Sequence, residues 1–384
     1  MKVIFVKNEL LKKVSMIELF YDLVFVYMIS QVTGLIHHLQ NGVISPSALS
    51  IFTLVVIVSI NSWMVQTVFN NRYGKSQWSN VILSFVDMAI VLYMSNAFSD
   101  TFDRHLIGFF IAAGLLSLTL AIQYLLVFVQ TKNEYDRNIA MAFMRILFFR
   151  TACLLAGGVL AGRWGTTIAL FGIITSWIIP AFTGKHTQKH PIIFSHLLER
   201  LTALIIIMFG ETIVGISKYF TQNTFSIQSI MIFIIVVSLF FTYIVEFDHL
   251  IEEQRTHETG NLLIYLHYFI LFGLSLVTVA LDFIHESEAN AIFSITCLYV
   301  GIALFYIGIV ITSYYNKTTL KLENYVVVAF IIATLMGYFT SMCFATFSII
   351  AGVTALTTLI NVVVITLSLV RRYERWPRYK YRRT

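Results

Sequence analysis

Ionisable side chains stand at helical spacing inside two very apolar stretches of this 384-residue chain. In "IELFYDLVFVYMIS", Glu18 and Asp22 are four residues apart and therefore share one helix face. In "SHLLERLTALIIIMFGETIVGIS", His196, Glu199 and Arg200 fall at i, i+3 and i+4 and form a second polar patch. Charges in such surroundings bind protons or ions, or they pair with each other to hold helices together.

Three further charges lie deeper in apolar sequence. Glu211 stands about 20 Å further along the helix that carries His196. A carboxylate at that depth must be protonated, paired or hydrated, so it is our first choice for a proton or cation site. Arg145 and Arg150 point about 140° apart on one helix and cannot serve one small site. For Arg150 a structural ion pair and an anion site both stay open.

Several of these candidate residues also have a purely structural interpretation. Glu18 is also placed to stabilise a helix start, because the N-terminal dipole favours a carboxylate there. Asp87 and His267 are secondary candidates, and a histidine at such a position is often a core hydrogen-bonding group. The acids inside apolar stretches outnumber the arginines, which favours a cation or a proton over an anion as the ligand.

Composition places these residues in a membrane protein. The chain is 58% hydrophobic and 12% charged, whereas a globular domain carries about a quarter charged residues. Its three cysteines lie in apolar runs without CxxC spacing, which argues against a zinc site or a disulfide framework. No Walker A, HExxH or GxSxG motif occurs. We therefore predict no cofactor, no metal site and no ATP-driven transport, and leave enzymatic activity open.

Twelve apolar runs are each long enough to cross a bilayer, which needs about 20 residues. All four prolines lie at run ends or outside the runs, as long helices require. The sequence predicts an all-α polytopic membrane protein whose helices cover 18–39, 47–69, 81–98, 106–130, 139–161, 166–182, 195–217, 226–247, 261–283, 290–314, 323–343 and 347–370.

Basic residues predict the orientation. Twenty of the 26 Lys and Arg lie in residues 1–17, in every second loop, or in residues 371–384, and only three lie in the opposite loops. The positive-inside rule then places both termini in the cytoplasm, with a basic arm and a basic tail. The tail interleaves arginines with tyrosines and a tryptophan, so we expect it to meet anionic lipid headgroups. Nucleic acid is not an expected partner.

A weak internal repeat follows when Glu18 is superposed on Glu199. "IELFYDLVFVYMISQVTG" then runs beside "LERLTALIIIMFGETIVG". The repeat would divide the chain into two six-helix halves, 18–182 and 195–370, related by an axis along the membrane normal, as in some secondary carriers.

The two charged stretches also carry a family resemblance. "ELFYDLVFV" and "HLLER…GE" resemble motifs of the bacterial low-temperature-requirement protein A (LtrA) family. The resemblance implies a polytopic bacterial membrane protein linked to growth in the cold, and matches Glu18, Asp22, His196, Glu199, Arg200 and Glu211 to the family's motifs. It implies no substrate. The stretch "FFTY", where the family has a tryptophan-rich segment, is a departure.

These observations favour a proton- or cation-coupled secondary transporter of the bacterial cytoplasmic membrane. Glu211 would carry the coupling proton or cation, Asp22 and Glu199 would be cytoplasmic acids, and Arg150 would be their charge partner. Two alternatives stay open: a lipid-handling protein (a scramblase or a lipid-modifying enzyme) and a membrane sensor without transport. A lipid site would need Arg145, Arg150 and His196 to converge. The solute, the coupling ion and any homo-oligomer stay undetermined.

Overall fold

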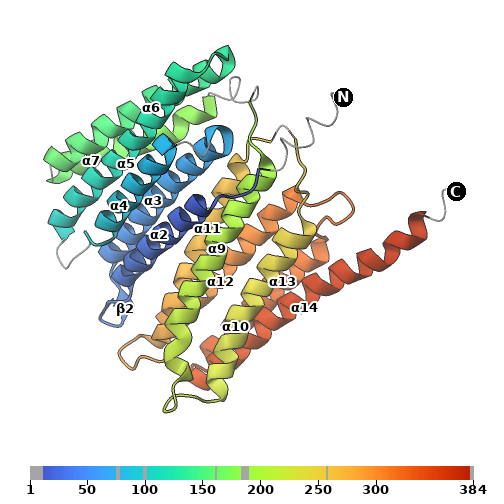
Figure 1. Ribbon diagram of the computed structural model, residues 1–384. Helices are drawn as coiled ribbons and strands as arrows, with labels where there is room; N and C mark the ends of the chain where they lie inside the picture. The colour runs from blue at the N-terminus through green and yellow to red at the C-terminus, as the bar shows by residue number, and fades with distance from the viewer. Residues whose placement is uncertain are drawn as a thin grey trace. The chain divides into compact units, whose positions relative to one another are not determined.

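The described part of the chain is almost entirely helical (Figure 1). The structure, a computed structural model, describes residues 12–74, 78–97, 102–160, 162–182, 190–256 and 258–380. These ranges contain twelve α-helices: α2 (Met16–Thr33), α3 (Pro46–Tyr73), α4 (Trp78–Ser95), α5 (Phe102–Gln130), α6 (Glu134–Leu160), α7 (Gly162–Phe182), α9 (Phe194–Ile216), α10 (Ile227–Ile244), α11 (Asn261–Phe283), α12 (Ala291–Thr312), α13 (Asn324–Cys343) and α14 (Phe347–Lys380). Each of the twelve predicted runs overlaps one of these helices, which supports an all-helical, polytopic chain. Residues 1–11 of the basic arm and 381–384 of the tail lie outside the described residues.

Ten of these twelve described helices, all except α7 and α9, are long and apolar enough to cross a membrane. Their outer faces are apolar as well. On α13, for example, Ile331, Met336 and Phe339 expose 54–65% of their surface. Water would make such faces costly, whereas lipid is their natural solvent. The chain is a multi-pass membrane protein.

The chain between α2 and α3 differs from the prediction. Helix α2 ends at Thr33 and a 3₁₀ turn at Ile36, so the run predicted to continue to residue 39 is shorter. A two-stranded hairpin follows, with β1 (Leu39–Gln40) paired antiparallel to β2 (Val43–Ile44). Asn41 and Gly42 form its turn with φ of 54° and 79°, and an Asn-Gly pair favours this type I′ geometry.

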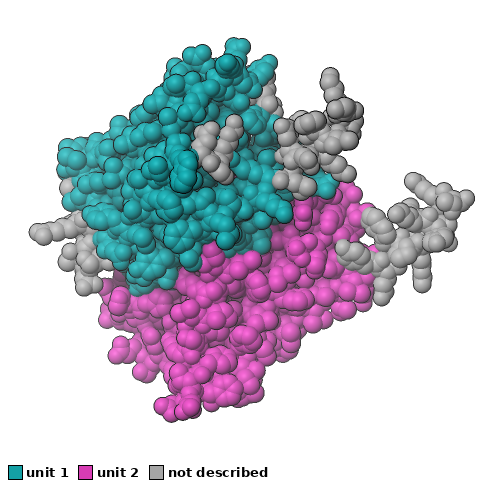
Figure 2. Space-filling view, viewed as in Figure 1, with its two compact units in different colours: residues 1–35, 46–204, 254–261 teal, residues 36–45, 205–253, 262–384 magenta. Residues whose placement is uncertain are grey.

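The chain divides into two compact units, drawn in different colours in Figure 2. Unit 1 comprises Met1–Leu35, Pro46–Leu204 and Gln254–Asn261, and unit 2 comprises Ile36–Ser45, Ile205–Glu253 and Leu262–Thr384. Because the division falls inside α9, the two polar patches of this helix belong to different units. The patch around Arg200 lies in unit 1, and Glu211 lies in unit 2.

Unit 1 has an aromatic and aliphatic core between α3, α5 and α6. Phe69, Tyr124 and Phe143 are buried there, and the rings of Tyr124 and Phe143 stack with centroids 5.2 Å apart. Because the core is packed with rings, α3 is held firmly beside α5 and α6. This fixes the end of α3 that carries the polar residues of the site.

Unit 2 has a close helix contact and a wide helical turn. Gly273 of α11 and Gly301 of α12 face each other, and a Cβ on either would come within 2.8 Å of the other's carbonyl oxygen. Small residues allow this approach between membrane helices. Helix α10 continues directly into a π-helix, η3 (Val245–Leu250), which the sequence did not predict.

Candidate functional site

The two charged stretches of the sequence meet inside unit 1. Glu18 and Asp22 come from the first turns of α2, and His196 and Arg200 from the first turns of α9. Their exposed fractions are 6%, 0%, 0% and 0% in that order. Four ionisable side chains are therefore removed from solvent and lipid together. We call Glu18, Asp22, His196 and Arg200, with Trp63 and Asn71 of α3, the charged cluster.

Asp22 is held by two donors. The guanidinium of Arg200 forms an ion pair with it through Nη2, and Nε lies 3.4 Å from Oδ2. The indole Nε1 of Trp63 donates to Oδ1 at 2.7 Å, and the Trp63 ring also lies 5.1 Å from the centre of the guanidinium. Charge-assisted hydrogen bonds of this kind are about twice as strong as neutral ones. Asp22 is thus the firmly fixed acid of the cluster.

Glu18 is held less tightly on its cluster side. Its Oε2 accepts from the backbone N–H and the hydroxyl of Ser15, both at 2.9 Å, which completes the N-terminal cap of α2. Its Oε1 faces α9, where His196 Nε2 lies at 3.4 Å and Arg200 Nη1 at 3.5 Å. Both separations exceed those of strong charge-assisted bonds. Oε1 is therefore the least constrained acceptor of the cluster.

Asn71 determines which nitrogen of His196 carries the proton. The backbone N–H of Ile193 donates to Asn71 Oδ1 at 2.8 Å, so the amide nitrogen must face the other way. That nitrogen donates to Ile193 O at 2.9 Å and lies 3.2 Å from His196 Nδ1. Nδ1 then acts as an acceptor, and the neutral ring carries its proton on Nε2, directed at Glu18. A second proton on Nδ1 would oppose the Asn71 N–H group.

Lys12 covers the rim of the cluster. Its ammonium donates to the carbonyls of Asn71 and Gly74 at 3.3 and 3.0 Å, and to Asn70 O, so it caps the C-terminal end of α3. Burial lowers the pKa of Lys12, and the nearby Glu18 carboxylate partly opposes that shift. Two acids, Glu18 and Asp22, thus lie near two basic groups, Lys12 and Arg200, and beside His196.

Other predicted site residues of unit 1 lie apart from the cluster. Glu199 is exposed and accepts from the Val14 N–H at 3.4 Å. Arg145 is exposed, whereas Arg150 is buried and donates to Asn61 Oδ1 at 2.6 Å and to Ser62 Oγ at 3.0 Å. Asp22 therefore pairs with Arg200. The described contacts of Arg150 are to an amide and a hydroxyl, and none of them is to Asp22.

A second polar layer lies deeper in unit 1. Gln66 donates to Gln123 at 2.8 Å, and Thr119 donates to the buried Asp87. A small cavity of about 10 Å³ between Tyr21, Gln66 and Arg150 is large enough for one water molecule. Polar side chains therefore continue from the cluster into the interior of the helix bundle.

The unit 2 candidates have different surroundings. Glu211 is half-buried. His267 is fully buried; its Nδ1 lies 2.6 Å from Leu263 O, so Nδ1 carries the proton and Nε2 faces the Tyr243 hydroxyl at 3.4 Å. His267 is thus a satisfied core hydrogen-bonding group, which agrees with its structural interpretation.

The sequence did not single out three residues that matter for these sites. Trp63 and Asn71 lie in a long, mostly apolar helix and were not singled out. Their spacing of eight residues, close to two helical turns, could have indicated that they share one polar face. Glu246 lies in "YIVEFD" at a predicted helix end, where acids are common, so it gave no distinct signal. It is fully buried.

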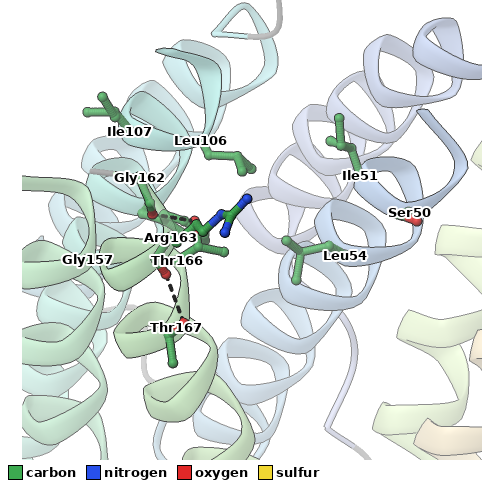
Figure 3. A pocket seen from close by; sticks show the side chains of 11 residues that line it. Ser50, Ile51, Leu54, Leu106, Ile107, Gly157, Gly162, Arg163, Thr166 and Thr167 are labelled. Carbon is green, nitrogen blue, oxygen red and sulfur yellow. Dashed lines mark hydrogen bonds between the residues drawn. The ribbon is translucent and has the colours of Figure 1, made fainter. Parts of the chain in front are cut away.

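A pocket of about 540 Å³ opens at the other end of unit 1 (Figure 3). Its walls come from the beginnings of α3, α5 and α7 and the end of α6. Figure 3 shows the Arg163 side chain extending into the space between α7 and α3, opposite Ile51 and Leu54. No described carboxylate lies within ion-pair distance of Arg163. The pocket combines an apolar wall with one positive charge, which suits an amphiphilic anion.

Comparison with known proteins identifies the family. The family model of the bacterial low temperature requirement A protein (LtrA) matches residues 13–370. The chain belongs to the LtrA family. This confirms the resemblance carried by "ELFYDLVFV" and "HLLER", and the structure shows that these two LtrA-like stretches contribute the four ionisable residues of the charged cluster. No curated protein and no solved structure matched the chain.

Proposed function

We propose that this LtrA-family chain is a secondary transporter of the bacterial cytoplasmic membrane, with both termini inside, coupled to protons through the charged cluster. One observation carries the proposal: two buried acids share one arginine, and Nε2 of a histidine faces one of them at 3.4 Å. Buried ionisable groups are expensive in a membrane and mark ion or proton pathways by default.

The unequal contacts assign different roles to the two acids. Asp22 is the anchor, because Arg200 and Trp63 both hold it. Glu18 is the exchanging acid, because its Oε1 has only long contacts to His196 and Arg200. A proton on Glu18 weakens its attraction to Arg200 and so loosens α2 from α9. Glu211 remains in the proposal as a second coupling carboxylate on α9.

The test uses purified protein in liposomes that enclose a pH-sensitive dye. An inward proton gradient is imposed and pools of amino acids, sugars, organic acids and polyamines are added outside. A pool that contains the solute should accelerate acidification in the wild type. Glu18→Gln and Glu211→Gln should abolish the acceleration, while Glu134→Gln, an exposed acid of α6, should keep it. A response that survives in Glu18→Gln refutes the role of the cluster.

The pocket at Arg163 favours a second function, the movement of lipids. It offers a cation above an apolar wall. A headgroup site built from Arg145, Arg150 and His196 is not supported, because Arg145 is exposed and the other two bind different partners. In the same liposomes, fluorescent anionic lipid should then exchange between leaflets, and Arg163→Gln should slow the exchange. Equal exchange with and without protein would reject this function.

A further inference from the structure

Unit 2 contains a π-helical turn whose C-terminal end is hydrogen-bonded to residues 315–317. The π-helix η3 (Val245–Leu250) closes with the Ile251 N–H donating to Glu246 O at 3.2 Å, five residues back. Beyond it, Lys317 N donates to Leu250 O at 2.9 Å and Glu252 N to Tyr315 O at 3.0 Å. A π-helical turn is uncommon and is often found at functional sites. In this chain it places one acidic side chain, Glu246, inside the bundle.

Glu246 is fully buried and has no charged partner among the described residues. Its exposed fraction is 0%, and that of Asn316, whose side chain lies beside it, is 2%. Neither carboxylate oxygen accepts a hydrogen bond of normal geometry from a described group, and no described cation lies within 4 Å. An ionised carboxylate in this position would lose its hydration without gaining a compensating charge. A neutral acid avoids that cost.

The charged side chains near the π-helical turn contact groups other than the Glu246 carboxyl. Asp248 and His249 of the same turn face each other at 3.4 Å with about half or more of their side chains exposed. Lys317 donates to the carbonyl of His249 at 3.0 Å. On α14, which packs against η3, Arg372 pairs with Glu323 at 2.6 Å. On α11, the ring of His267 lies against Phe247, and its Nδ1 lies 2.6 Å from Leu263 O. None of these groups compensates a charge on Glu246.

Polar side chains lead from Glu246 into unit 2. Ser238, Thr242 and Glu246 follow each other at four-residue intervals and are all buried, so they lie along one side of the helix. The buried hydroxyl of Tyr306 lies near Thr242 and near Asn361 of α14. Helices α10 and α14 pack along each other (Figure 1). A proton on Glu246 therefore has hydroxyl and amide groups beside it in an otherwise apolar interior.

We propose that Glu246 is a proton-binding site of unit 2, with Asn316 Oδ1 as the acceptor for its acid O–H. The acid is neutral while the π-helical turn is closed. It releases its proton to water, as hydronium, when water reaches the turn, and takes it back on closure. The site is separate from the charged cluster of unit 1 and does not depend on the proposed transport function.

Infrared spectroscopy of the full-length protein in lipid tests this proposal, because a protonated carboxyl has a C=O band that a carboxylate lacks and that shifts in D₂O. At neutral pH, the wild type should show an acid band that Glu246→Gln removes. Glu253→Gln, an exposed acid of the following loop, should leave it unchanged. Asn316→Leu should move the band to higher frequency, because the O–H loses its acceptor.

Two outcomes would overturn the proposal. One is a folded Glu246→Gln protein with an unchanged acid band, and the other is an Asn316→Leu band at the wild-type frequency. If Glu246→Gln does not fold, Glu246→Asp replaces it: a shifted band supports the assignment, and an unmoved band rejects it. Loss of the band on adding Na⁺ at constant pH would also overturn the proposal, since the site would then bind a cation.

Discussion

Asp22→Asn provides the sharpest test of the charged cluster. The change keeps the shape of the side chain and an oxygen for the Trp63 N–H, but it removes the charge that faces Arg200. Arg200 is fully buried, and its remaining acid, Glu18, lies 3.5 Å away. Removing one partner of a buried ion pair costs about 3–5 kcal/mol, mostly because a charge is left uncompensated.

The same substitution at Asp87 is the matched control. Asp87 is also buried, at 1% exposure, but it meets the hydroxyl of Thr119 and no described cation within 4 Å. An amide can accept that hydrogen bond equally well, so Asp87→Asn should cost less than about 1 kcal/mol. The difference between the two variants isolates the contribution of the arginine.

A rescue variant completes the experiment. Asp22→Asn combined with Arg200→Met removes both charges of the pair and should recover at least half of the lost stability, because apolar replacements of buried pairs are often neutral. Stability is measured as the free energy of unfolding during titration of mixed micelles with a denaturing detergent. Equal losses in Asp22→Asn and Asp87→Asn, without rescue by Arg200→Met, would refute the role of the Asp22–Arg200 ion pair in holding α2 to α9.

Three further predictions concern other parts of the chain. Asn71→Asp should convert His196 to its doubly protonated form, because Nδ1 then faces an acceptor; ¹⁵N chemical shifts of labelled histidine report it, and an unchanged neutral ring would contradict the assigned tautomer. Gly42→Ala should lower the melting temperature, at a cost of about 1–2 kcal/mol, because Gly42 has a φ of 79°, whereas Gly34→Ala, with no atom within 4 Å of the new methyl, should not. Burial lowers the pKa of His37 despite the opposing Asp282, so the unfolded chain binds this proton more readily. Stability should therefore fall as the pH drops below about 6.5, and His37→Gln should flatten that part of a melting-temperature profile.

The helices could be predicted from the sequence because apolar runs, proline positions and basic loops all follow directly from the bilayer. The partners inside the bundle could not. Several membrane helices of this chain are apolar on every side, so hydropathy does not show which face of α3 carries Trp63 and Asn71 to α2 and α9. Asp22 and Arg200 are 178 residues apart, and spacing alone did not identify Arg200 as the partner of Asp22; Arg150 was predicted instead.

Local departures from regular helix were also missed. The hairpin at 39–44 had an Asn-Gly signal in the short segment between two predicted helices, and this segment was treated only as a connection. The π-helix at Val245–Leu250 had no recognisable signal, because its geometry depends on the pairing of residues 250–252 with 315–317. Glu246 therefore looked like an ordinary acid at a helix end, and only the packing shows that it is buried.

The unequal contacts of the two acids explain why the first helix carries both. If Glu18 and Asp22 were held equally, a proton arriving at either would weaken the same ion pair, and α2 would lose its attachment to α9. Arg200 and Trp63 hold Asp22 closely, while Glu18 Oε1 stays at 3.4–3.5 Å from its neighbours. In the proposed mechanism, Asp22 therefore keeps the helices in register while Glu18 exchanges the proton. Exchanging the two side chains, as Glu18→Asp with Asp22→Glu, should therefore preserve the net charge but abolish proton coupling in the liposome assay. Full coupling in that double variant would show that position within the cluster does not determine the role of each acid.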